Sequence, residues 1–115
     1  MEGTDEFEAW YFDLPDPDAE AVAIAISLLQ EHGPALGAPR SSSIISSRHA
    51  HMRELRVQRG GRPLRVLYAF DPRRTAILLL GGDKTGDKRW YDIYVPRADR
   101  LYDEHLEKLR KEGSI

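Results

Sequence analysis

The residues best suited to chemistry are arginines and lysines in the middle of the chain. Arg56 and Arg65 lie in two segments of alternating hydrophobicity, and Lys84, Lys88 and Arg89 lie in the glycine-containing stretch that follows. A guanidinium group stays charged and can donate two parallel hydrogen bonds, which suits it to phosphate oxygens. These residue types therefore favour the binding of a phosphate-bearing ligand.

The charges of the chain are divided unevenly along its length. Residues 1–38 contain nine acidic residues and no Lys or Arg, whereas residues 39–115 contain 17 basic and 10 acidic residues. The formal charges of the two parts are therefore −9 and +7. This asymmetry predicts a basic surface that binds a polyanion and an acidic face directed elsewhere. Ordinary solvated surface on both parts is the alternative.

Length and composition bound the class of protein. A chain of 115 residues with 41% hydrophobic and 31% charged residues predicts one soluble domain, residues 1–115, with a single modest core. Cysteine is absent, which excludes disulfides and thiolate metal sites and favours a reducing compartment. The longest apolar run, from Ala21 to Leu29, is too short to span a bilayer. We therefore expect a cytoplasmic protein.

Hydrophobic periodicity predicts two helices in the first 33 residues. The first is capped by Thr4 or Asp5 and stopped by Pro15, and the second ends at Gly33-Pro34. A flexible, serine-rich loop is expected from Pro34 to Ser47.

Beyond this loop the hydrophobic period changes to two. Residues 52–58, 64–70 and 76–80 predict a three-stranded antiparallel meander, with Gly60-Gly61 in its first turn. A last helix, started or broken near Pro96, runs to about Lys111. The predicted fold class is α+β, in which an N-terminal helical hairpin packs on a small antiparallel sheet that is followed by a C-terminal helix.

The meander determines where the arginines point. Arg65 alternates with Leu64 and Val66, so its side chain lies on the sheet face opposite their apolar stripe. Arg56 on the neighbouring strand is expected to share that face. The alternative is that both arginines are exposed and pair with Glu54 or Asp87.

Two other motifs carry weaker chemistry. The stretch from Gly81 to Lys88 contains glycine and lysine but lacks the spacing of a nucleotide-binding P-loop, which we reject. His49 and His51 could transfer protons at neutral pH, but their serine-rich surroundings favour surface histidines.

The order of these segments resembles the HigB-type (phage Gp49-like) branch of the RelE/ParE toxin superfamily, over residues 5 to about 109. The resemblance is carried by Arg53-Glu54-Leu55-Arg56-Val57, Gly60-Gly61, Arg65-Val66-Leu67-Tyr68 and the hydrophobic strand that leads into Gly81-Gly82-Asp83-Lys84. Members of this superfamily usually begin with a strand, and here only Met1-Glu2-Gly3 precedes the first helix. That strand is either missing or replaced by a segment of a partner chain.

The resemblance implies a RelE-like fold and the toxin of a type II toxin–antitoxin system, an endoribonuclease that cleaves mRNA on the ribosome. It also implies a cognate antitoxin, a helix-turn-helix protein from an adjacent gene, and a reaction that requires no cofactor or metal. Cleavage through the 2′-oxygen of RNA needs a base, cations for the phosphorane and an acid for the leaving oxygen. The implied catalytic residues are Arg65, Lys84, Lys88 and Tyr91, and the implied RNA-binding residues are Arg53, Arg56, Arg73, Arg74 and Arg89.

Several alternatives stay open beside this hypothesis. Tyr91 could stack on a base, transfer a proton or be buried with Trp90 and Tyr94. The chain could instead resemble the ParE-like members that inhibit DNA gyrase, although the basic residues favour a nuclease. A degenerate fold that only binds a partner is favoured by the short N-terminus and the net charge of −2. We expect the antitoxin to dock on the acidic hairpin and the adjacent sheet edge through basic or apolar groups.

Overall fold

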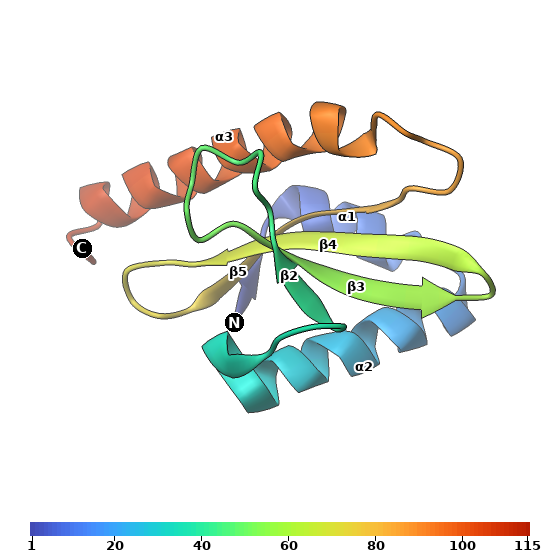
Figure 1. Cartoon of the computed structure of the whole chain (residues 1–115). Helices are drawn as coiled ribbons and strands as arrows, with labels where there is room; N and C mark the ends of the chain where they lie inside the picture. Colours follow the sequence, from blue (N-terminus) through green and yellow to red (C-terminus); the bar gives the residue numbers. More distant parts are fainter.

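The computed structural model, which describes residues 1–115, layers three helices on the two faces of one sheet (Figure 1). In Figure 1 helix α2 lies below the sheet and α3 lies above it. The elements in chain order are β1 (Glu2–Gly3), α1 (Asp5–Phe12), α2 (Asp16–His32), the 3₁₀ turn η1 (Gly33–Ala35), β2 (Ser41–Ser43), β3 (Arg53–Arg59), β4 (Arg62–Phe70), β5 (Ala76–Asp83) and α3 (Trp90–Lys111). The predicted α+β class is confirmed, and no helix combines the length and apolar content needed to cross a membrane.

The sheet has five strands in the order β1-β5-β4-β3-β2. Its centre is the predicted meander, in which β3, β4 and β5 pair antiparallel. Gly60 and Gly61 form the first turn with φ angles of 59° and 75°, the left-handed region that favours glycine. The hairpin prediction is therefore confirmed.

Two edge strands were not predicted as part of the sheet. Strand β1, which has two residues, pairs parallel with Ile77 and Leu78 of β5. The expectation that the first strand is missing or replaced by a partner chain is therefore wrong. A strand of two residues is too short to produce an alternating pattern. Strand β2 consists of three serines, which have no marked β-propensity, and it pairs with β3 inside the predicted loop.

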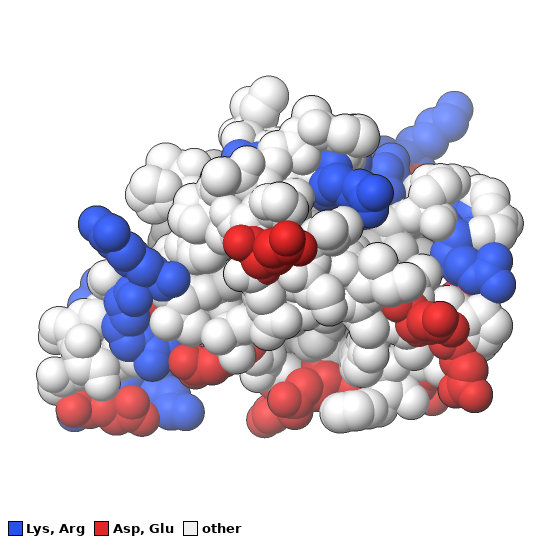
Figure 2. Space-filling model, turned by 90° about the horizontal axis from the view of Figure 1, so that it is seen from below, with Lys and Arg blue, Asp and Glu red and all other residues white.

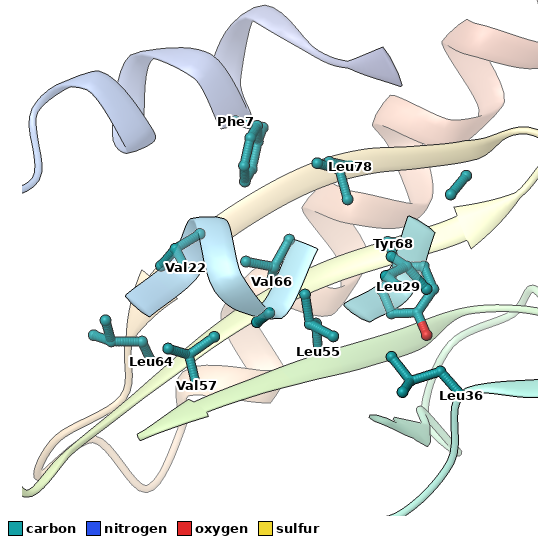
Figure 3. Close-up of a cluster of buried hydrophobic side chains, with 12 residues drawn as sticks. Phe7, Val22, Leu29, Leu36, Leu55, Val57, Leu64, Val66, Tyr68 and Leu78 are labelled. Carbon is teal, nitrogen blue, oxygen red and sulfur yellow. The ribbon is translucent and has the colours of Figure 1, made fainter. Parts of the chain in front are cut away.

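The first core cluster lies between the helical hairpin and one face of the sheet (Figure 3). Thr4 caps α1 by accepting a hydrogen bond of 3.0 Å from the Phe7 amide, as one of the two expected caps. Phe7 from α1 and Leu29 from α2 pack with Leu55 and Val66 of the central strands. The predicted apolar stripe of β4 thus faces the two helices.

The second core cluster lies between the opposite face of the sheet and α3. Val95, Ala98 and Tyr102 of the helix pack with Leu67 and Ile77 of the strands. The helix begins at Trp90, so the prediction of a start or break near Pro96 is wrong. Trp90 is 1% exposed, and its packing anchors a first turn that Pro96 alone does not interrupt.

Two adjacent glycines in β5 let the helices approach the sheet from both sides. A Cβ atom on Gly81 would lie 2.1 Å from the Trp10 ring of α1, and one on Gly82 would lie 2.8 Å from Nε1 of Trp90. These glycines lie inside β5, although the sequence suggested that the chain leaves the sheet there. Their missing side chains are what allows both tryptophans to pack against the backbone.

A segment that we call the strap, residues 44–52, joins β2 to β3 and is fastened to α3; it is the green loop that rises to α3 in Figure 1. Asp99 accepts hydrogen bonds from the Ser47 hydroxyl at 2.5 Å and from the Arg48 amide at 3.3 Å. His49 contacts Asp103 at 2.7 Å. The expected loop is therefore held in place by contacts that the spacing of its residues does not predict.

We expect Gly81→Ala to lower the free energy of unfolding by about 1–3 kcal/mol, because the added methyl group overlaps the Trp10 ring and forces it to move. Gly37→Ala is the matched control, since the nearest atom to its Cβ is 4.0 Å away and its φ is not positive. Urea unfolding measures both values. Equal stability of the two variants would contradict the packing described here.

Candidate functional site

The face of the sheet that is turned toward α3 carries charged side chains at the end nearest the start of that helix. Leu55 of β3 and Val66 of β4 face the hairpin, so the alternation of each strand sends Glu54, Arg56 and Arg65 to the other face. Arg56 and Arg65 are direct cross-strand partners. The prediction that these two arginines share a face is confirmed.

Glu54 is the centre of this charged group. It is only 2% exposed, and its Oε1 accepts a hydrogen bond of 2.9 Å from Nε of Arg56. Nε of Arg65 lies 3.4 Å from the same oxygen, close enough for an ion pair. A buried carboxylate is tolerated when cations neutralise it, and here two arginines from adjacent strands do so.

Arg65 itself is buried, with 9% of its surface exposed. Its Nη1 donates to the Leu64 carbonyl oxygen at 2.9 Å, while its Nε makes no hydrogen bond. The expectation that Arg65 is exposed is therefore wrong, although its expected pairing with Glu54 is present. The reason is that the first turn of α3 and the Glu54 side chain cover this part of the sheet face.

Tyr91 in the first turn of α3 completes the group. It is half-buried, which places it between the two alternatives of core residue and exposed reactive group. Burial raises the pKa of the Tyr91 phenol, the neighbouring Glu54 carboxylate raises that pKa further, and Arg65 opposes the rise. Nζ of Lys84 lies 5.3 Å from the centre of the Tyr91 ring. At neutral pH the phenol therefore keeps its proton and can donate it.

An open pocket of about 410 Å³ joins these groups to solvent. Glu54, Arg56 and Tyr91 form one side of it, and the other side is formed by Ser42, Ser43, Ile44, Ile45 and Ser46. A carboxylate, a guanidinium and a phenol thus border one pocket. Together they can accept a proton, bind an anion and donate a proton.

The remaining predicted site residues fall into two groups. Lys88 and Arg89 are exposed on the loop that leads into α3, immediately before Tyr91. Arg53, Arg73 and Arg74 lie elsewhere. Lys84 of this loop therefore lies beside Tyr91, whereas neither Lys88 nor Arg89 lines the pocket and the other three arginines are separated from it.

Arg53 lies on the hairpin-facing side of β3, where its Nε and Nη1 donate to Ser41 and Ser43 at 3.0 Å each. It lines a separate pocket of about 590 Å³ with Arg74. Strand β4 carries the chain about 17 Å from Arg65 to Phe70, before the turn that holds Arg73 and Arg74. These arginines therefore cannot contact the same phosphate as Arg65.

Arg73 belongs to a second buried charged group at that turn. Asp71 has a fully buried side chain that contacts Arg73 at 2.8 Å and His105 at 2.9 Å. Burial alone would raise the pKa of Asp71, but hydrogen bonds from His105 and Arg73 lower it below its usual value. Arg73 also reaches Glu2 at 2.7 Å, so this group ties β1, the β4–β5 turn and α3 together.

Glu54 was overlooked as a candidate site residue. The sequence contained a signal for it, since Glu54 alternates with Arg56 and must share its face of the strand. The burial of Glu54 could not be predicted in this way, because the helix that covers it begins more than 30 residues later in the chain. The same holds for the strap as a wall of the pocket.

Comparison with known proteins places the chain in a described group. Residues 9–103 match the family model described as phage-derived protein Gp49-like (DUF891). Two proteins of Mycobacterium tuberculosis (strain ATCC 25618 / H37Rv) are similar to the chain. "Putative toxin HigB3" is 47% identical over 102 residues, which cover 88% of each chain. "Putative toxin HigB2" is 43% identical over 104 residues, which cover 89% of this chain and only 52% of the relative. No solved structure was found to match the chain.

The raised pKa of Tyr91 predicts a pH dependence of stability. The folded protein holds this proton more tightly than the unfolded chain, whose phenol has the ordinary value of 10.0. The contribution of this proton to the free energy of unfolding is fully present below the unfolded-state pKa and is lost as the pH rises through the folded-state pKa. We expect the free energy of unfolding to fall more steeply above pH 10.0 in the wild type than in Tyr91→Phe.

Urea unfolding at a series of alkaline pH values measures this difference. Tyr102, whose pKa is also raised by burial, is present in both proteins and cancels in the comparison. Parallel pH profiles of the two proteins would contradict the environment assigned to Tyr91.

Proposed function

The chain belongs to the family of phage-derived Gp49-like proteins, and on that premise we propose that it is the toxin of a type II toxin–antitoxin system, acting on mRNA as an endoribonuclease. The names of its two relatives support the assignment as a toxin. Glu54, Arg56 and Tyr91, which line one pocket, and Arg65 beside Glu54 support the assignment as a nuclease. We place the activity in the cytoplasm, where the mRNA and ribosomes are.

The observation that carries the nuclease proposal is the buried Arg65 with an Nε that makes no hydrogen bond. This Nε faces Glu54 Oε1 at 3.4 Å, so a phosphate oxygen that entered beside Glu54 would supply the missing hydrogen-bond acceptor. The positive end of the α3 dipole lies at the same place, because the helix begins at Trp90. Arg65 and Arg56 together would hold the scissile phosphate and stabilise the charge that develops on it.

Proton transfer is divided between the carboxylate and the phenol. Glu54 accepts the proton of the 2′-hydroxyl group. The 2′-oxygen of the RNA then bonds to phosphorus, while the bond from phosphorus to the 5′-oxygen breaks. Tyr91 donates its proton to the departing 5′-oxygen, and Lys84 beside its ring stabilises the resulting phenolate. The products are a 2′,3′-cyclic phosphate and a 5′-hydroxyl, and every atom and proton is accounted for by protein and RNA.

The exposed cations around the pocket suit the flanking nucleotides. Lys88 and Arg89, exposed on the loop that precedes α3, would bind phosphates of the RNA beyond the cleaved bond. Arg53, Arg73 and Arg74 would contact only more distant RNA, such as that of the ribosome. Presence of β1 in the sheet removes one argument for a degenerate, non-catalytic fold. The combination of carboxylate and phenol with cations favours RNA cleavage over gyrase binding.

We expect Glu54→Gln and Arg65→Lys each to reduce the rate of RNA cleavage by about 100-fold or more. The first change removes the proton acceptor, and the second removes the planar guanidinium that donates hydrogen bonds to the phosphate. Arg59→Ala, on the exposed end of β3, is the control and should cleave at the wild-type rate. A cell-free translation reaction with primer-extension mapping gives these rates. Circular dichroism establishes that each variant is folded. Full activity of folded Glu54→Gln and Arg65→Lys would reject this site.

The antitoxin surface is proposed to be the helical hairpin. Glu6, Glu8 and Asp13 are exposed on and beside α1, next to Phe12, which is 78% exposed. Figure 2 views the molecule from below Figure 1 and shows several separate acidic groups on this side, with basic groups at the left, at the right and in the upper middle of the view. An apolar group among carboxylates suits a partner that presents basic and apolar residues. A partner docked here would leave the pocket on the α3 side uncovered.

Reversal of charge to Lys at Glu6, Glu8 and Asp13 should weaken antitoxin binding at least tenfold, because close like charges then meet across the interface. The same reversal at Glu104 and Glu107 on α3 and at Glu112, which follows its last residue, serves as the matched control, since all three are exposed. Isothermal titration with the antitoxin measures both affinities. Equal weakening by the two triple variants would mean that the hairpin is not the specific surface, and cleavage by the first variant should stay unchanged.

A further inference from the structure

Strand β2 and the start of the strap line the pocket together with the candidate catalytic residues. Ser42 and Ser43 of β2 and Ile44, Ile45 and Ser46 after it border the same pocket as Glu54, Arg56 and Tyr91. Nothing in the proposed proton transfers uses this wall. Its side chains are small hydroxyls and one apolar group that reaches solvent.

Two adjacent isoleucines in the strap have opposite environments. Ile44 is 8% exposed and packs in the second core cluster, whereas Ile45 is 96% exposed. The exposed large hydrophobic residues of the protein are few, and Ile45 has the highest exposure among them. Single exposed apolar residues are common, so exposure alone assigns no role. The position of Ile45 on the rim of a pocket that holds phosphate-binding groups gives the exposure its meaning.

The strap is fixed rather than free. Asp99, itself 5% exposed, holds Ser47 and the Arg48 amide, and His49 packs edge-on against Tyr102 with ring centres 4.9 Å apart. Tyr91, Asp99 and Tyr102 are all on α3. One helix therefore sets the distance between the reactive phenol and the exposed side chain of Ile45, which lowers the entropy lost when a ligand binds between them.

We propose that Ile45 is the contact for a nucleobase of the bound RNA and that Ser42 of β2 and Ser46 of the strap bind the edge of that base. This inference rests on the proposed function, because it takes RNA as the occupant of the pocket. A nucleotide joins a phosphate to a flat ring with apolar faces and polar edges. The pocket offers Arg56 for the phosphate, Ile45 for the faces of the ring and the hydroxyls of Ser42 and Ser46 for its edges.

The test uses a single-stranded 2′-O-methyl RNA, which keeps its bases and phosphates but has no free 2′-hydroxyl to react. Fluorescence anisotropy measures its affinity for the wild type and for Ile45→Ser. We expect Ile45→Ser to bind about three- to tenfold more weakly, in proportion to the loss of one base contact. Ile24→Ser, at a residue 56% exposed on α2, is the matched control and should bind like the wild type.

A series of the same oligonucleotides, each lacking one base, identifies the contact. Removal of one particular base should weaken binding to the wild type and have no further effect on Ile45→Ser. Unchanged affinity and an unchanged profile in Ile45→Ser would overturn the inference, as would failure of the wild type to bind the RNA at all. If the wild type binds this RNA and leaves ordinary RNA uncut, the nuclease proposal fails, while the comparison with Ile45→Ser still decides the role of Ile45.

Discussion

The burial of the Glu54 carboxylate between Arg56 and Arg65 is the constraint on which the rest of the site depends. A carboxylate that is almost inaccessible to water is stable only where cations replace the lost hydration. The register of β3 and β4 supplies them, because it sets the two arginines directly opposite each other. A shift of β3 by one residue would move Glu54 and Arg56 to the hairpin face, bury them among apolar groups and separate them from Arg65.

Helix α3 connects this ion pair to the rest of the molecule. Its first turn provides Tyr91, its middle turns hold the strap through Asp99, and His105 reaches the buried Asp71 near the opposite end of β4. The helix can lie this close to the sheet because Gly82 leaves room for Trp90. Packing, the second charged group and the candidate site are therefore coupled through one helix, so that loss of its anchor would disturb all three.

The sequence allowed the long strands, the Gly60-Gly61 turn and the shared face of Arg56 and Arg65 to be predicted, since each follows from local alternation or backbone conformation. Features that depend on distant segments could not be predicted in this way. The burial of Arg65 results from cover by α3, and the ion pairs of Arg73 with Asp71 and Glu2 join the β4–β5 turn to the start of the chain. Periodicity reports the face on which a side chain lies, but it does not report what covers that face.

The chemistry proposed for this site gives RNA products with defined ends, because the attacking oxygen belongs to the RNA itself. The most direct test is therefore to identify the end groups of an RNA cut by the purified protein in the presence of ribosomes. Mass spectrometry of the fragments should find a 2′,3′-cyclic phosphate, or the phosphate formed by its opening, on the upstream fragment and a 5′-hydroxyl on the downstream fragment. A 5′-phosphate on the downstream fragment would mean that water is the attacking group, and it would contradict the roles given to Glu54, Arg65 and Tyr91.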